Sequence, residues 1–127
     1  MIQLWAPVVA WMAAIFYGSL MPTVPGPVSD NFSDTALHAG GYFILALITL
    51  RAVARGHWSS VTVPALLVAW VISVIHGASV EWLQMYAPPR MAEWRDLGND
   101  AIGAALALGL ARAWGIIRST SRAEPDS

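Results

Sequence analysis

The chain has no cysteine, no lysine and few charged residues of either sign. Without cysteine it can build no disulfide framework, no thiolate metal site and no cysteine nucleophile. All seven of its basic residues are arginines, and eight acidic residues bring the formal net charge to −1. A protein that binds nucleic acid carries a basic patch or stripe. We therefore expect no nucleic-acid partner.

Polar residues are too few to cover a soluble protein. Of the 127 residues only 12% are charged, whereas 57% are hydrophobic, and the mean hydropathy is +0.55. A soluble domain has about 25% charged and 45–50% apolar residues. Because a chain of this length has little interior, the excess apolar surface must face lipid. The composition predicts an integral membrane protein whose main partner is the bilayer.

Four apolar stretches are long enough to cross a membrane, namely residues 2–21, 36–54, 61–80 and 97–117. About 20 helical residues cross a hydrocarbon core of roughly 30 Å. Within lipid each stretch should be a helix, because a helix pairs all of its own backbone groups. We predict an all-α fold with one domain over residues 1–117, a bundle of four transmembrane helices. Residues 118–127 form a polar tail that we expect to be disordered.

The distribution of arginine predicts the orientation. With four spans, the N-terminus, the second connector and the tail share one side of the membrane. Most of the arginines lie on that side, and the third connector holds the others. By the positive-inside rule both termini are then cytoplasmic, in a multi-pass protein of the cytoplasmic (inner) membrane. The arginines on the cytoplasmic side are Arg51, Arg55, Arg112, Arg118 and Arg122.

Other polar side chains gather where the second stretch begins, the third ends and the fourth begins. In the predicted topology these three points lie on the same, extracytoplasmic, side. Ionisable groups within membrane spans are costly, and by default they are candidates for function. We therefore predict a one-sided polar site. Its residues are Asp34, His38, Tyr42, Glu81, Gln84, Asp96 and Asp100.

The residue types suggest separate roles within this site. His38 with Glu81 or Asp96 is the candidate catalytic, proton-handling group, because a carboxylate can orient an imidazole that acts as general acid or base. Arg90 lies in the connector between Glu81 and Asp96, and its guanidinium can hold a carboxylate or phosphate with two hydrogen bonds. The candidates for ligand binding are Asp34, Tyr42, Gln84, Arg90 and Asp100.

A metal site is chemically feasible but the sequence does not assign one. His38 with Glu81, Asp96 and Asp100 would suit zinc or manganese. The sequence has no closely spaced histidine pair on one helix, such as HxxxH or HExxH. We therefore predict no metal ligands and name no cofactor.

Small residues follow the acidic positions along the fourth stretch. Gly103, Ala107 and Ala111 recur at a spacing of four, and such a stripe lets helix backbones approach closely in lipid. The stripe predicts close packing, either within one chain or between copies in an oligomer.

Two segments resemble the motifs of the VanZ-like family of bacterial integral membrane proteins. In the segment 33–42 an Asp is followed by His four residues later and by Tyr after four more. The segment 81–103 is similar to the second motif, with Glu, Gln three residues on, a proline-containing turn, Arg, and then Asp, Asp and Gly. The resemblance covers residues 11–109, and it implies a polytopic membrane protein, some relatives being linked to low-level teicoplanin resistance. The chain departs from the motifs at Thr35, Pro89 and Asp100.

The leading functional hypothesis is recognition of an amphiphilic cell-envelope molecule at the outer leaflet. A lipid-linked precursor, a glycopeptide or a lipopeptide would present its charged groups at the depth of the polar site. Whether an enzymatic step follows recognition is left open. The alternative hypothesis is a non-catalytic structural or assembly subunit in which the polar residues only lock helix ends together.

Overall fold

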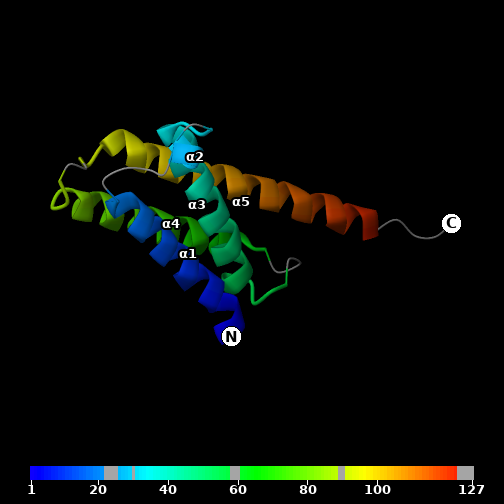
Figure 1. The fold of residues 1–127 in the computed structure, drawn as a ribbon. Coiled ribbons are helices and arrows are strands. Elements are labelled where there is room, and N and C mark those ends of the chain that lie inside the picture. The colour runs from blue at the N-terminus through cyan, green and yellow to red at the C-terminus, as the bar shows by residue number, and fades with distance from the viewer. Residues whose placement is uncertain (22–25, 30, 58–60, 89–90, 123–127) are drawn as a thin grey trace.

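The computed structural model describes residues 1–21, 26–29, 31–57, 61–88 and 91–122, without the side chains of residues 28, 29 and 117–122. These residues form helices and connecting turns, with no strand among them. Figure 1 shows one short helix and four long helices. The short helix is α2 (Gly26–Ser29). The long helices are α1 (Ile2–Leu20), α3 (Asp34–Val53), α4 (Val63–Gln84) and α5 (Trp94–Arg122).

The sequence provides clear start signals for the two central helices. Ser33 precedes α3, and its hydroxyl accepts a hydrogen bond from the backbone N–H of Ala36 at 3.1 Å. Thr62 caps α4 in the same way, by accepting from the N–H of Ala65 at 3.3 Å. Ser and Thr are favoured at this position because they satisfy a backbone donor that has no partner within the helix. Between the two helices, Gly56 reverses the chain with a positive φ of 79°.

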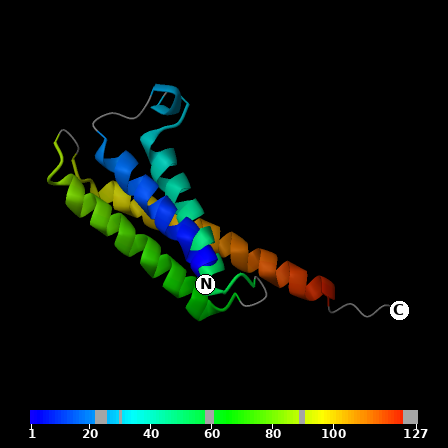
Figure 2. The ribbon, with the colours of Figure 1, turned by 60° about the horizontal axis from the view of Figure 1, so that its bottom comes forward.

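The helices α3 and α4 form the centre of the bundle. They pack against each other, and both α1 and α5 pack against this central pair. In Figure 2 the end of α1, the start of α3, the end of α4 and the start of α5 lie toward the same end of the molecule. The C-terminal part of α5 extends beyond the other helices (Figures 1 and 2).

Small residues allow α5 to approach the central pair closely. Ala104 and Ala107 are fully buried in a core that also contains Ala46 and Ala69. At Gly103 an added methyl group would overlap the backbone carbonyl of Ala39 on α3. The predicted stripe of small residues therefore packs within the chain, against α3.

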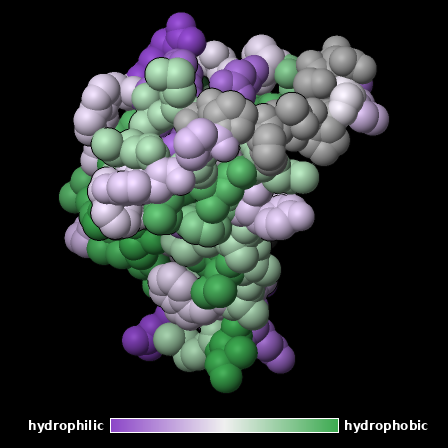
Figure 3. All heavy atoms as spheres, turned by 60° about the vertical axis from the view of Figure 1, so that its left-hand side comes forward, coloured by the Kyte–Doolittle hydropathy of each residue, from purple (hydrophilic) through white to green (hydrophobic). Residues whose placement is uncertain are grey.

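Among the described residues, three helices are long and apolar enough to cross a membrane: α1, α3 and α4. The surface agrees with this, because large hydrophobic side chains are exposed along the bundle, for example Val9, Leu67 and Ile75. In Figure 3 the visible face is mainly hydrophobic in its middle, and hydrophilic residues gather at its two ends. The chain is a membrane-embedded protein. The predicted fourth span lies within α5, which is not among these three helices in the described part of the chain.

The helix α5 is longer than the fourth stretch that the sequence predicts. It begins at Trp94 rather than at residue 97, and it continues to Arg122, into the segment predicted to be a disordered tail. Hydropathy marks the lipid-facing part of a helix, whereas residues 118–122 include two arginines, which favour helix in water, beside serine and threonine, which favour it less. The backbone helix can therefore extend past the apolar stretch. Residues 123–127 lie outside the described part of the chain.

Candidate functional site

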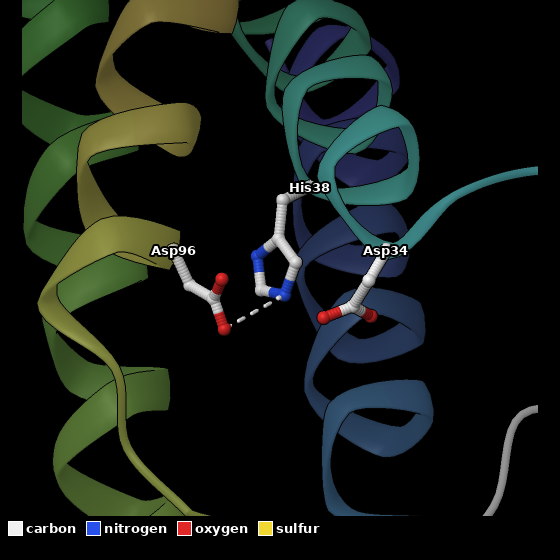
Figure 4. Close-up of side chains that lie close together, drawn as sticks. All are labelled: Asp34, His38 and Asp96. Atoms are coloured by element: carbon white, nitrogen blue, oxygen red, sulfur yellow. Dashed lines mark ion pairs between the residues drawn. The ribbon is translucent and has the colours of Figure 1, made fainter.

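His38 lies in the second turn of α3, between acidic residues of two helices. Asp34 lies one turn earlier on α3, while Asp96 and Asp100 are one turn apart at the start of α5, so each pair shares a helix face. His38 Nδ1 donates a hydrogen bond to Asp100 Oδ1 at 2.9 Å. His38 Nε2 lies 3.5 Å from Asp96 Oδ2. Figure 4 shows the imidazole between the carboxylates of Asp96 and Asp34.

A carboxylate from α4 completes the group around the imidazole. One oxygen of Glu81, one nitrogen of His38 and one oxygen of Asp100 lie within 4.8 Å of one another. The same limit holds for a second group, formed by Asp34, His38 and Asp96. We name these residues of α3, α4 and α5 together the His38 cluster. Its members are Asp34, His38, Glu81, Asp96 and Asp100.

Most of this acidic cluster is shielded from solvent. Asp100 is 1% exposed, Glu81 5% and Asp96 8%, whereas Asp34 is exposed and His38 is half-buried. The burial of several carboxylates side by side is unfavourable unless cations or protons balance their charges. Within the described residues, the ion pairs of this cluster all involve His38.

Two side chains at the end of α4, the carboxylate of Glu81 and the amide of Gln84, contact neighbouring helix ends. Glu81 Oε2 accepts the backbone N–H of Glu93, just before α5, at 2.8 Å. Gln84 Nε2 donates to the carbonyl of Ser19, near the end of α1, at 2.9 Å. The oxygen atoms Glu81 Oε1 and Gln84 Oε1 are buried and have no hydrogen-bond partner among the described residues. Each side chain thus holds one contact and retains one free acceptor.

Tyr42, which the sequence groups with the ligand-binding candidates, makes its hydrogen bond outside the His38 cluster. Its hydroxyl lies 3.0 Å from Nδ1 of His76, and His76 Nε2 lies 3.2 Å from the carbonyl of Met12. A carbonyl only accepts, so Nε2 must carry the hydrogen, and a neutral ring then leaves Nδ1 to accept from the tyrosine. Tyr42 therefore donates to His76. This chain of hydrogen bonds joins α3, α4 and α1.

His76 is a helix-packing histidine whose partners the sequence does not indicate. It lies five residues before Glu81 and so falls off the helix face that carries Glu81 and Gln84. Its partners are 34 and 64 residues away in the sequence. No local spacing could have indicated them.

The cationic partner that the sequence predicts for these acids is Arg90, which lies outside the described part of the chain. The nearby Arg95 is exposed and lies 3.5 Å from Glu93, which is also exposed. In the described residues the cluster thus combines one imidazole with four carboxylates. Such a group attracts positive charge, whether as a metal ion, an ammonium group or a guanidinium.

The structure brings the candidate catalytic residues His38, Glu81 and Asp96 into one cluster, but the carboxylate that hydrogen-bonds His38 is Asp100. Comparisons of the chain with protein-family models, with curated proteins and with solved structures gave no match. The interpretation of the site therefore depends on its own geometry and chemistry.

Proposed function

We propose that the chain is a VanZ-like protein of the cytoplasmic membrane, with four spans and both termini in the cytoplasm. In this proposal the His38 cluster faces the outer leaflet and recognises an amphiphilic cell-envelope molecule, either a lipid-linked precursor or a glycopeptide or lipopeptide. The observation that carries the proposal is the convergence of four carboxylates and an imidazole at the ends of apolar helices.

The chemistry of the cluster fits the headgroup region of a bilayer. Carboxylates pair with the ammonium groups of such ligands, and they lose less hydration near headgroups than at the bilayer centre. Arg90 is the predicted partner for a phosphate or carboxylate of the same ligand. The free oxygens Glu81 Oε1 and Gln84 Oε1 provide further acceptors. Trp82 and Met85, which adjoin Glu81 and Gln84 in the sequence, are exposed and offer a surface for the ligand's hydrocarbon part.

A structural role is the second candidate, and specific contacts favour it. Gln84 joins α4 to α1, Glu81 joins α4 to the start of α5, and His38 joins α3 to α5. A cluster that only locks these helix ends would need no ligand. The two candidates predict different effects of a substitution. If the cluster only holds helix ends together, a substitution lowers the amount of folded protein. If the cluster binds a ligand, a substitution lowers the effect of the protein at unchanged abundance.

Teicoplanin susceptibility tests the proposed function. We expect a susceptible bacterium that expresses the chain to need several-fold more teicoplanin for growth inhibition. His38→Gln and Asp96→Asn should return this concentration to that of cells without the chain, with unchanged abundance in the membrane. The matched control is His57→Gln, because His57 is an exposed histidine in the connector at the other end of α3. It should retain the full effect.

Two results would contradict this interpretation. If the wild-type chain leaves teicoplanin susceptibility unchanged, glycopeptide recognition is wrong. If His38→Gln and Asp96→Asn lower abundance in proportion to the lost effect, the cluster is a lock and the structural candidate is supported.

A further inference from the structure

The inner part of the His38 cluster has the composition of a metal site. His38, Glu81 and Asp100 come from three different helices, and one donor atom from each lies within 4.8 Å of the others. An imidazole with two carboxylates suits zinc and manganese. The sequence shows no metal motif because these ligands are 43 and 19 residues apart, and only the helix packing brings them together.

The ligand atoms are close enough to share one ion after a small movement. Metal-to-ligand distances for zinc are about 2.0–2.2 Å and its sites are tetrahedral, so two ligands lie roughly 3.4 Å apart. His38 Nδ1 and Asp100 Oδ1 are 2.9 Å apart, so they would separate by roughly half an ångström to hold the ion. In the described structure a proton between them makes a hydrogen bond, and a divalent ion could replace that proton.

This group contains a buried acceptor that makes no hydrogen bond within the described part of the chain. Glu81 is 5% exposed, and its Oε1 has no hydrogen-bond partner in the described part of the chain. A buried carboxylate oxygen without a partner costs free energy, because it has lost its hydrogen bonds to water and has formed none within the protein. Its other oxygen, Oε2, is held by the N–H of Glu93, so Glu81 is fixed in place with Oε1 free to bind an ion.

A neighbouring carboxylate is positioned to orient the imidazole. His38 Nε2 faces Asp96 Oδ2 at 3.5 Å, on the side of the ring away from Nδ1. Histidine ligands of metals commonly offer their second nitrogen to a carboxylate, which sets the orientation of the ring. Gly77 of α4 leaves room for the side chain of Asp100 on α5, because a methyl group at position 77 would lie 2.9 Å from Asp100 Oδ2.

We propose that His38, Glu81 and Asp100 bind one divalent transition-metal ion, zinc or manganese, with His38 Nδ1 as the nitrogen ligand. Asp96 acts as the positioning residue on Nε2. The ion balances the charge of the buried carboxylates and ties α3, α4 and α5 together at this end of the bundle. The inference does not depend on which envelope molecule the protein recognises.

Zinc binding to the full chain in detergent tests this proposal. After removal of metal with a chelator, titration with zinc chloride should give one ion per chain, and zinc should raise the unfolding temperature. Glu81→Gln, Asp100→Asn and His38→Gln should each weaken zinc binding at least tenfold and abolish the rise. His57→Gln is the matched control, because it changes a distant, exposed histidine, and it should retain the wild-type affinity. Asp34→Asn removes an acid of the outer group, and it should weaken zinc binding less than Glu81→Gln does.

A second measurement needs no substitution and is independent of whether the variants fold. X-ray absorption at the zinc edge of the wild-type chain should show one imidazole together with oxygen ligands. The proposal is wrong if the spectrum shows no imidazole or if zinc binds wild type and His38→Gln equally. It is also wrong if Asp34→Asn loses the ion while Glu81→Gln retains it, since the ion would then lie in the outer group.

Discussion

Single hydrogen bonds between helices help to define how the helices of this protein pair. The hydroxyl of Tyr42, which is 2% exposed, donates to His76, and His76 in turn donates to the carbonyl of Met12. The rings of Tyr42 and His76 also contact each other, with centroids 5.7 Å apart. In a membrane protein the apolar side chains of neighbouring helices are no more attractive than lipid tails, so such polar links help to define which helices pair.

We expect Tyr42→Phe to destabilise the protein by about 1 kcal/mol. The substitution removes the hydroxyl and leaves His76 Nδ1 without its donor, while the ring contact remains. Tyr17→Phe is the matched control, because Tyr17 is 71% exposed. Unfolding of the purified variants in mixed detergent micelles measures the difference. Equal stabilities of the two variants would show that the hydrogen bond contributes nothing.

The packing of α5 on α3 depends on the small residues of α5. At Gly103 the two backbones approach so closely that a methyl group would meet the carbonyl carbon and oxygen of Ala39. Both groups belong to the main chain and cannot rotate away, so a larger residue must push the helices apart. Since α5 also carries Asp96 and Asp100, this contact sets the position of two members of the His38 cluster.

Gly103→Ala should therefore destabilise the bundle by about 1–3 kcal/mol, the usual cost of overpacking. Gly109→Ala on the same helix is the control, because nothing lies within 4 Å of the added methyl group. Alanine favours helix over glycine by up to about 1 kcal/mol, so this control should be at least as stable as wild type. Detergent unfolding of both variants gives the comparison. A stable Gly103→Ala protein would contradict the close contact.

The molecule as a whole has a polar end that four helices build together. By length and composition, α1, α3 and α4 are apolar and long enough to cross a membrane. α5 packs on α3 and α4 and presents large exposed apolar residues such as Ile102, Leu106 and Leu110. These exposed residues support the proposal that α5 also crosses the membrane, which places the C-terminus on the same side as the N-terminus.

Cysteine labelling tests this topology, and the absence of native cysteine makes every signal specific. With a membrane-impermeant thiol reagent on intact cells, we expect labelling of Phe32→Cys and Met91→Cys, which are exposed residues in the first and third connectors. His57→Cys and a cysteine added after Ser127 should react only after the cells are made permeable.

Each departure from this labelling pattern has a definite meaning. Labelling of the added C-terminal cysteine from outside, together with Met91→Cys, would show that α5 does not cross the membrane. Reversal of all four sites would show that the arginine distribution does not set the orientation.

Composition and periodicity alone determine much of this protein. A long apolar run in lipid has to be helical, because the backbone finds no other hydrogen-bond partners there. The helical repeat also determines that Asp34 and His38 share a face, as do Asp96 and Asp100. These are local properties. The sequence alone therefore predicts the helices and the polar residues at their ends.

Only the tertiary structure decided which of these groups meet. It paired His38 with Asp100 rather than with Glu81, and it turned Tyr42 toward His76. It also placed the stripe of small residues inside the bundle, against α3. Such pairings depend on how far each helix is rotated about its axis and on where two helices cross. Packing between residues distant in the chain sets both quantities, so no spacing along one helix can reveal them.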